Sequence, residues 1–485
     1  MISFSIALAL LVLGYIFYGA FVARMFGQDP SRPTPATAMA DGVDYVSMPT
    51  WKVYLIQFLN IAGLGPIFGA IMGIMFGPAA FLWIVFGTIF GGAVHDYLSG
   101  MLSLRSGGSS LPELVGSHLG GGMKNVVCIF TIILMVLVAA VFVYNPADLM
   151  AMLTPGYLDR TFWVVTIFVY FTLAAMLPID RLIGRIYPLF GFVLLFMALG
   201  LLVGLFVHAD AVPEIWQGFH NYKADPEASP IFPMMFVSIA CGAISGFHAT
   251  QSPMMARCLR TERHARLVFY GAMVTEGIVA LIWAAAAVAF AGSYENLQTA
   301  LASGSPAVLV NEISRSWLGL AGGVLAILGV VAAPITSGDT ALRSVRLIIA
   351  DYFGLDQKKI RNRLLVTVPI CALCFAVMMM PYEVLWRYFA WSNQVLATFT
   401  LWTLTVYLAR ASKPYVITLL PALFMTSVTA TYILFAPEGL PLLLGALGLP
   451  SIPYLWAVGG GLIVSCTLLL VFARSRRPVG VTAAA

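Results

Sequence analysis

Apolar windows about twenty residues long recur along the whole of this 485-residue chain. A helix needs roughly 20 mainly apolar residues to cross about 30 Å of hydrocarbon. Only 10% of the residues are charged, whereas a soluble domain usually carries about a quarter. The sequence therefore predicts an all-α polytopic membrane protein with about 13 transmembrane helices. The predicted spans are 3–23, 53–76, 79–102, 125–144, 161–177, 186–207, 231–250, 267–291, 317–336, 364–380, 386–408, 415–436 and 453–473.

The basic residues lie very unequally on the two sides of these spans. The side reached after odd-numbered spans holds 22 of the 26 Lys and Arg, and the other side holds 4. Because cytoplasmic loops carry most Lys and Arg, we expect the N-terminus outside and the C-terminus in the cytoplasm. Basic residues placed in this way do not imply nucleic-acid binding. The strongest anchors are expected in two loops, one with Arg257, Arg260, Arg263 and Arg266 and one with Arg343, Arg346, Lys358, Lys359, Arg361 and Arg363.

Two spans carry glycine and proline where a helix would otherwise be continuous. Residues 60–69 read NIAGLGPIFG, and residues 241–253 read CGAISGFHATQSP. Glycine eases departure from helical angles and proline removes a backbone donor, so we expect both segments to unwind. Unwound backbone is tolerated at membrane depth only inside protein or beside a water-filled cavity, where it often holds a ligand. The alternative is that these glycines only let helices pack closely.

The two breaks lie in spans 2 and 7, which are five spans apart. A second repeat that begins after five spans inserts upside down, and this predicts a LeuT-like 5+5 inverted repeat with a midplane site at the paired breaks. The expected units are a peripheral first helix at 1–24, repeats at 51–208 and 229–409, and two peripheral C-terminal helices at 414–474. The candidate substrate-binding residues at the breaks are Asn60, Ala62, Gly63, Gly65, Pro66, Gly242, Ser245, Gly246, His248 and Gln251.

A few ionisable side chains lie within the spans, where a charge is costly and usually functional. His95 and Asp96 are adjacent in span 3 and can carry protons, bind a metal, or form a structural pair. His248, in the second break, can bind a substrate carboxylate or titrate, or it can be a satisfied structural histidine. Glu276 stands alone in span 8, either as a proton carrier or as the partner of a loop arginine.

Two further polar groups complete the candidate site. Span 9 closes with oxygen ligands at Thr336, Ser337 and Asp339, which can share a sodium-like site with the carbonyls near Gly63, or Asp339 can cap the next helix. In span 11, the amides of Asn393 and Gln394 can bind substrate or join helices.

Several motifs together resemble one family of membrane proteins. They are RPTPA at 32–36, DGVDY at 41–45, IAGLGP at 61–66, GAVHD at 92–96, ISGFH at 244–248 and SNQ at 392–394. In combination they resemble the carbon starvation protein A (CstA) family, with a match from about residue 30 to 400. The resemblance implies a multi-pass transporter of the bacterial inner membrane, related to the amino acid, polyamine and organocation superfamily. It further implies uptake of peptides during starvation, with pyruvate as the substrate of some relatives.

These observations lead to an expected function. We expect a secondary transporter, not an enzyme, that takes up short peptides by alternating access with H⁺ or Na⁺ as the coupling ion. His95, Asp96, Glu276, Thr336, Ser337 and Asp339 are the candidate ion-coupling residues. The alternatives are a symporter of pyruvate or another small carboxylate, a channel, or a metal-dependent intramembrane enzyme. We expect no resident metal or organic cofactor, a small-molecule or peptide substrate, and the lipid bilayer as the surroundings; the sequence does not indicate an oligomeric state.

Overall fold

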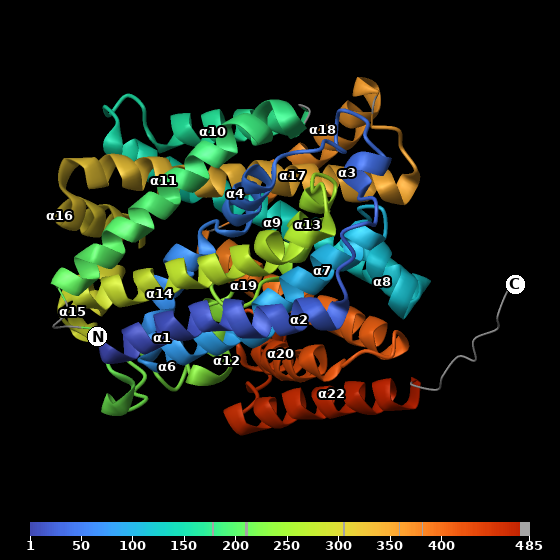
Figure 1. Ribbon diagram of the computed structural model, residues 1–485. Coiled ribbons are helices and arrows are strands. Elements are labelled where there is room, and N and C mark those ends of the chain that lie inside the picture. Colours follow the sequence, from blue (N-terminus) through green and yellow to red (C-terminus); the bar gives the residue numbers. More distant parts are fainter. Residues whose placement is uncertain (177–178, 209–211, 304–305, 358, 381, 476–485) are drawn as a thin grey trace, which may run out of the picture.

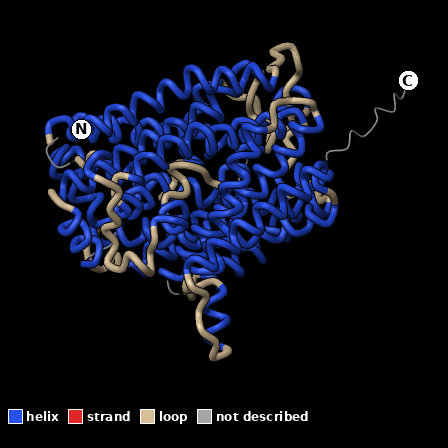
Figure 2. The backbone as a smooth tube through the Cα atoms, turned by 90° about the horizontal axis from the view of Figure 1, so that it is seen from below, coloured by secondary structure: helices blue, strands red, loops and turns tan. Residues whose placement is uncertain are grey.

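The computed structural model describes residues 1–176, 179–208, 212–303, 306–357, 359–380 and 382–475, and these ranges contain helices and loops but no β-strand. The helices run roughly side by side along the molecule (Figures 1 and 2). Each of the predicted spans overlaps a helix. Among the described residues, nine helices are long and apolar enough to cross a membrane, or ten if one bent pair counts as a single span. The all-α polytopic fold is therefore confirmed.

The helices of the N-terminal half are α1 (Ile2–Leu13), η1 (Gly14–Tyr18), α2 (Gly19–Phe26), α3 (Pro35–Ala38), α4 (Thr50–Ile61), η2 (Gly65–Gly69), α5 (Ala70–Gly73), η3 (Ile74–Phe76), α6 (Ala79–Leu82), η4 (Trp83–Gly92), α7 (Ala93–Arg105), α8 (Leu111–Leu119), α9 (Gly121–Leu153), α10 (Arg160–Met176) and α11 (Ile179–Val207). Those that follow are η6 (Ile215–Gln217), α12 (Ile231–Ser238), α13 (Gly246–Ala256), η7 (Glu262–His264), η8 (Arg266–Gly271), α14 (Ala272–Ala291), α15 (Tyr294–Ser303), α16 (Pro306–Ala326), η9 (Ile327–Val331), α17 (Ala332–Phe353), α18 (Ile360–Val377), α19 (Tyr382–Arg410), α20 (Val416–Phe435), α21 (Leu440–Ala446) and α22 (Tyr454–Ser475).

The first predicted break lies where it was expected. Helix α4 ends at Ile61, η2 begins at Gly65, and the two arms are bent by 54°. A Cβ on Gly63 would lie 2.9 Å from the ring of Phe142, so the break packs tightly against α9. The unwound backbone is therefore enclosed by protein, as membrane depth requires.

The second break is real but shorter than predicted. Residues 239–245 are not helical, whereas α13 already begins at Gly246 and includes His248 and Pro253. The polar residues of this stretch do not loosen the helix, because the hydroxyls of Thr250 and Ser252 donate to the carbonyls of Phe247 and His248 in their own helix. His248 therefore lies in the first turn of a helix and not within the break.

The prediction that a helix ends at Thr336 to Asp339 is wrong. Helix α17 runs through this stretch to Phe353. The Thr336 hydroxyl donates to Ala333 O at 2.8 Å, and the Thr340 hydroxyl donates to Thr336 O at 3.0 Å. The polar cluster thus bonds to its own helix, which continues, so Asp339 caps no helix.

The placement of Arg343 and Arg346 in a loop is wrong for the same reason. Both lie inside α17 and are buried, each with 1% of its surface exposed. Arg257, at the end of α13, is also buried. These arginines are part of the packed end of the helix bundle, where Asp44 and Asp351 face them.

The basic loops gather at one end of the molecule, called here the basic end. There Arg105 pairs with Glu262, and the Lys413 ammonium donates to Phe26 O. In Figure 1 this end holds α3 and α8, whereas the N-terminus lies at the other end near α15. The alternation of basic and non-basic loops in the sequence thus corresponds to two ends of the structure.

The N-terminus is anchored at the end opposite the basic end. Its ammonium donates to the Glu214 carboxylate, as do the backbone amides of Ile2 and Ser3. Burial alone would raise the pKa of Glu214, but these hydrogen bonds outweigh it and lower the pKa to about 2.

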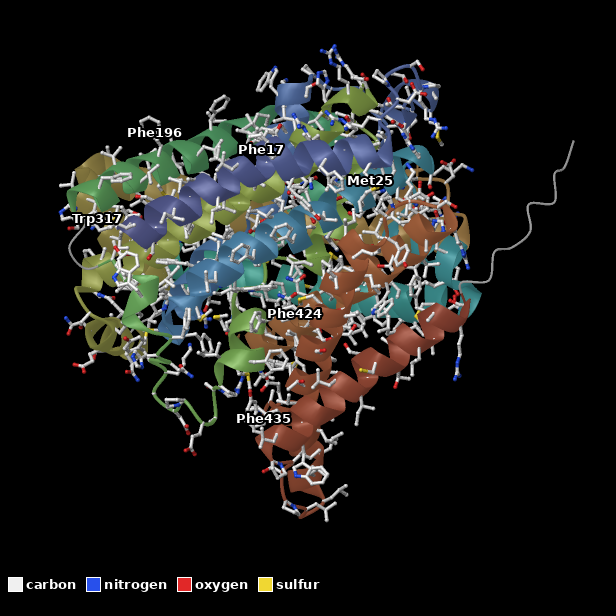
Figure 3. All side chains as sticks on the ribbon, turned by 60° about the horizontal axis from the view of Figure 1, so that its bottom comes forward. Phe17, Met25, Phe196, Trp317, Phe424 and Phe435 are labelled. Atoms are coloured by element: carbon white, nitrogen blue, oxygen red, sulfur yellow. The ribbon has the colours of Figure 1, made fainter. Side chains whose placement is uncertain are left out.

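Large apolar side chains point outwards around the bundle, as a lipid-facing surface requires. Phe17 on η1 and Phe196 on α11 are 69% and 64% exposed (Figure 3). Polar side chains such as Asn60, His248, Glu276 and Gln251 are fully buried instead. The molecule is apolar outside and polar at its centre, and the candidate site lies in that centre.

Candidate functional site

The two breaks touch each other directly. A Cβ on Gly65 would lie 2.1 Å from Cys241 Cβ and 2.4 Å from its Sγ, so only glycine allows this approach. On the other side, a Cβ on Gly242 would lie 2.5 Å from Ala280 Cβ on α14 and 3.9 Å from Pro66 Cα. Gly65, Pro66 and Gly242, which the sequence singled out separately, thus form one junction.

Four ionisable side chains form a connected group beside this junction. Asp96 on α7 accepts a hydrogen bond from His95 Nδ1 at 2.7 Å and another from His248 Nδ1 at 2.9 Å. The Nε2 of His248 faces Glu276 Oε2 at 3.4 Å. All four are fully buried. They are called here the histidine–carboxylate cluster.

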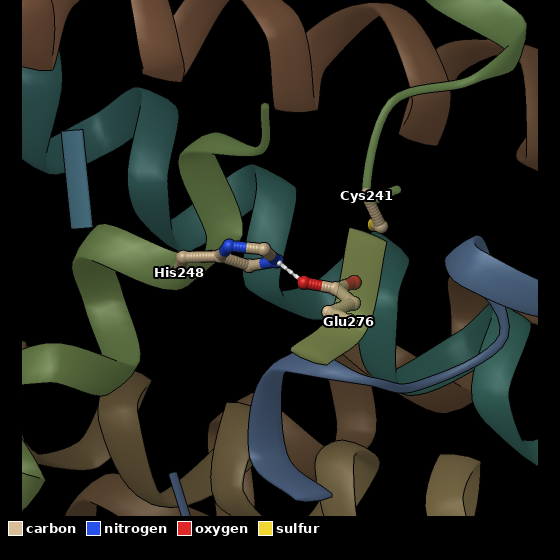
Figure 4. A group of neighbouring side chains, drawn as sticks. All are labelled: Cys241, His248 and Glu276. Carbon is tan, nitrogen blue, oxygen red and sulfur yellow. Dashed lines mark ion pairs between the residues drawn. The ribbon is translucent and has the colours of Figure 1, made fainter. Parts of the chain in front are cut away.

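The histidine–carboxylate cluster joins residues that the sequence suggested only one by one. His95 and Asp96 do form a pair, but His248 comes from α13 and Glu276 from the second turn of α14. Figure 4 shows the imidazole of His248 pointing at the Glu276 carboxylate. Glu276 is therefore not isolated, and its ion-pair partner is a histidine and not a loop arginine. No spacing rule connects these positions in sequence, because α7, α13 and α14 meet only in the fold.

Two amides of α19 fix the ends of the second break. Asn393 Oδ1 accepts from the Phe247 amide at 2.7 Å and from the Ser245 hydroxyl at 3.1 Å, so it caps the start of α13. Gln394 Nε2 donates to Phe236 O at 3.1 Å, at the end of α12. Both side chains thus bind the backbone of the broken helix. Gly246 lies so close to α19 that a Cβ would sit 2.4 Å from Asn393 O.

The carbonyls that end α4 are hydrogen-bonded by α17. The Ser337 hydroxyl lies 3.2 Å from Leu59 O and 3.0 Å from Asn60 O, and it donates to them. The last carbonyls of a helix have no partner within it, so this hydroxyl supplies one. The predicted meeting of α17 with the first break exists, but Ser337 contacts carbonyls three residues before Ala62 and Gly63.

Asp339 lies two residues after Ser337 on α17 and accepts from two tyrosines. The hydroxyls of Tyr170 on α10 and Tyr187 on α11 both donate to its Oδ2, the former at 3.1 Å. Thr336, Ser337, Asp339, Tyr170 and Tyr187 are called here the α17 cluster. Nothing in the sequence around Tyr170 or Tyr187 singled out these two residues.

Several buried amides near the breaks have free hydrogen-bonding capacity. Among the described residues, Gln57 and Asn60 on α4 have no side-chain hydrogen bond, and Gln251 has none on its Oε1. Gln57 lies one turn before Asn60, so the two share a helix face. The sequence analysis missed Gln57, although a glutamine one turn before the break was a usable signal.

An apolar cavity of about 720 Å³ lies between η4, α12 and α20, away from these polar groups. Its lining includes Phe86, Phe90, Phe236 and Phe424. Such a cavity suits a lipid chain but offers no group that would bind a carboxylate or a peptide bond. The candidate site is therefore at the junction of the breaks and not in this cavity.

At the basic end, two arginines of α17 form ion pairs with Asp44. Arg346 Nη2 lies 3.3 Å from Asp44 Oδ1, and Arg343 Nη1 lies 3.9 Å from the same oxygen. Asp44 lies in the loop before α4, so these ion pairs connect that loop to α17.

A family model described as "Carbon starvation protein CstA" matches residues 1–155, 147–322 and 298–432 of the chain. An "Uncharacterized membrane protein" of Haemophilus influenzae is 41% identical over 352 residues, which are 63% of this chain and 95% of that protein. "Peptide transporter CstA" of Bacillus subtilis is 26% identical and covers 88% of each chain. "Pyruvate/proton symporter BtsT" of Escherichia coli is 25% identical over 56% of this chain and only 46% of that protein.

Solved transporters share the fold. The structure of MhsT in complex with L-phenylalanine aligns with a TM-score of 0.54 over 89% of this chain and 99% of that chain, at 14% sequence identity. A manganese transporter of Eremococcus coleocola aligns with a TM-score of 0.50, also at 14% identity. At such identity the likeness concerns the fold, which is the expected LeuT-like transporter fold. From the family match and this fold, the chain is a membrane transporter that belongs to the carbon starvation protein CstA family.

Proposed function

We propose that this protein takes up short peptides by alternating access, driven by the inward movement of a cation. The observation that carries the proposal is the junction of two broken helices, where Gly65 meets Cys241, beside four buried ionisable side chains. Freed backbone and unpaired amides such as Gln57 and Asn60 suit a peptide, which offers both donors and acceptors. Relatives named as peptide transporters support this substrate class.

The proposed coupling cation is a proton. Sodium prefers oxygen ligands, and in the α17 cluster two tyrosines donate to Asp339 Oδ2, which leaves Oδ1 as the one oxygen of this carboxylate without a hydrogen bond among the described residues. In the histidine–carboxylate cluster, both oxygens of Glu276 lack a hydrogen bond among the described residues. A positive charge held between Glu276 and His248 would relieve the cost of burying that carboxylate.

A small carboxylate such as pyruvate is the second candidate substrate. A relative named as a pyruvate/proton symporter supports it. A proton held between His248 and Glu276 would serve this substrate as well as a peptide. The two substrates share a carboxylate, which the half-helix N-terminus of α13 would favour through its positive end. They differ in size, so one uptake assay separates them.

We further propose the arrangement in the membrane. The repeats are residues 51–208 and 229–409, with peripheral helices at 1–24 and 414–474. The basic end faces the cytoplasm of a bacterial inner membrane, because basic loops remain inside. The N-terminus, held by Glu214 at the opposite end, is then outside.

The experiment is uptake by purified protein in proteoliposomes. Labelled trialanine and labelled pyruvate are offered separately under an inward proton gradient without sodium, and under an inward sodium gradient without a pH difference. We expect saturable accumulation of trialanine under the proton gradient. Accumulation of pyruvate alone would select the second candidate, and sodium-driven accumulation would refute the coupling cation. Downhill, non-saturating flux would show a channel, and conversion of the solute would show an enzyme.

A further inference from the structure

Three potential metal ligands of different chemistry meet at the junction of the breaks. Cys241, His248 and Glu276 each offer a ligand atom, and these atoms all lie within 4.8 Å of one another. Cys241 comes from the second break, His248 from α13 and Glu276 from α14 (Figure 4). All three are buried. The fold thus brings together a thiol, an imidazole and a carboxylate from three different segments.

His248 is held in the orientation that a metal ligand needs. Its Nδ1 donates to Asp96 Oδ2 at 2.9 Å, which leaves the lone pair of Nε2 directed at Glu276. Metal-binding histidines almost always donate their other ring nitrogen in this way, often to a carboxylate. Neither Nε2 nor the two Glu276 oxygens have a hydrogen bond among the described residues. Two acceptors therefore face each other at 3.4 Å, and a cation between them would remove their repulsion.

Cys241 lies close enough to His248 and Glu276 to be the third metal ligand. Its Sγ is 3.6 Å from the Ser245 hydroxyl, to which it donates, and 3.5 Å from Asn393 Nδ2, from which it accepts. The amide of Asn393 directs an N–H at the sulfur, which would stabilise a thiolate. A Cβ on Gly65 would lie 2.4 Å from the Cys241 Sγ, so the thiol packs directly against the first break.

The charges also fit a divalent ion. The ion pairs of Asp96 and Glu276 among the described residues are all with histidine and include no Lys or Arg. A divalent ion bound by one thiolate and one carboxylate is neutral overall, and its binding releases the proton of the Cys241 thiol. The neutral imidazole of His248 adds no charge. Asp96 lies outside the ligand set and keeps its own negative charge, which accepts hydrogen bonds from His95 and His248.

We propose that Cys241, His248 and Glu276 bind a transition-metal ion of the zinc and cobalt class, with Asp96 as the residue that positions His248. Thiolate, imidazole and carboxylate are the ligands that zinc accepts, at about 2.0–2.3 Å in a tetrahedral site that leaves a fourth position open. The donors must draw together by about 1 Å to reach such distances. The inference also rests on the proposed function, because the ion would occupy the place of the coupling cation and so stop transport.

The test measures binding directly on the full-length protein with Co²⁺ alone as the probe. We expect one Co²⁺ per chain, with intense tetrahedral bands and a thiolate-to-cobalt charge-transfer band that zinc removes. Cys241→Ser should abolish the charge-transfer band, and Asp96→Asn should weaken Co²⁺ binding by about 10- to 100-fold. The matched control is Cys466→Ser, since Cys466 is exposed on α22 and should leave the spectrum unchanged.

The outcomes separate this inference from the proposed function. The metal site is overturned if no thiolate-to-cobalt charge-transfer band appears, or if the band persists in folded Cys241→Ser. Either result leaves the proposed function standing when proton-driven uptake is intact and zinc does not inhibit that uptake. The opposite outcome is a protein that shows the tetrahedral and charge-transfer bands of bound Co²⁺ but transports neither solute under any gradient. It supports the metal site and refutes the proposed function. Should Cys241→Ser fail to fold, His248→Gln provides the same spectroscopic comparison, with loss of the tetrahedral bands as the expected result.

Discussion

The histidine–carboxylate cluster and the α17 cluster are both buried and both lie beside a helix break, yet their hydrogen bonding differs. Asp339 accepts from two tyrosine hydroxyls, and Ser337 donates to two helix-end carbonyls. Glu276 has no hydrogen bond among the described residues and faces the lone pair of His248. The first arrangement joins α4, α10, α11 and α17 and leaves Asp339 Oδ1 without a hydrogen bond, whereas we propose that the second binds a cation. A buried carboxylate is therefore informative only together with its partners.

The largest effect is expected for Glu276→Gln, which keeps the shape of the side chain and removes its charge. Accumulation under a proton gradient should fall below about a tenth of the wild-type value, because a buried intramembrane charge is usually functional. Exchange of labelled for unlabelled substrate should continue. The thermal unfolding midpoint should stay level or rise, since glutamine needs no neutralising cation. Full accumulation by folded Glu276→Gln would contradict the role of this cluster.

Gly65→Ala should separate the two breaks. The added Cβ would overlap Cys241, so we expect a loss of about 1–3 kcal/mol in unfolding free energy and of most uptake. Gly459→Ala is the matched control, because a Cβ at Gly459 on α22 meets nothing within 4 Å. That control should be neutral or slightly stabilising, as alanine favours a helix more than glycine does. Equal effects of the two substitutions would show that the junction has no special role.

Asp339→Asn should affect stability more than coupling. Both tyrosine hydroxyls lose a charged acceptor and face a neutral amide instead, which should lower the unfolding free energy by about 1–2 kcal/mol. Proton-driven accumulation per folded molecule should remain above half of the wild-type value. A folded Asp339→Asn protein that exchanges but no longer accumulates would move the coupling site to the α17 cluster.

The smallest effect is expected for Ser337→Ala. It leaves Leu59 O and Asn60 O without their side-chain donor and should cost about 1 kcal/mol of stability. Uptake should remain independent of sodium. Thr467→Ala, which removes an exposed hydroxyl on α22, should change neither stability nor uptake and serves as the control. A sodium requirement that disappears in Ser337→Ala would reveal a sodium site at α17.

The sequence was sufficient to predict the breaks but not the partners of the side chains near them. Glycine and proline act through the local backbone, so the unwound segments near Gly63 and Gly242 could be predicted from their own residues. Asp96, His248 and Glu276 meet only because α7, α13 and α14 pack together, and no spacing in the sequence encodes that contact.

Two wrong predictions concern helix α17, at Thr336–Thr340 and at Arg343 and Arg346. The polar run from Thr336 to Thr340 is typical of a helix end, but its hydroxyls hydrogen-bond to carbonyls of their own helix, which continues. Arg343 and Arg346 looked like solvated loop residues, but Asp44 from a distant loop allows them to be buried. In the first case the partners are backbone carbonyls three or four residues earlier in the same helix, and in the second the partner is a carboxylate from a distant loop.

The most direct test of the account compares three proteins under one proton gradient without sodium. Wild type, Glu276→Gln and Asp339→Asn are reconstituted at equal folded amounts, and the accumulation of labelled trialanine and pyruvate is measured. The account predicts accumulation of one of these solutes by wild type and by Asp339→Asn, and none by Glu276→Gln. Accumulation by Glu276→Gln together with its loss in Asp339→Asn would contradict it.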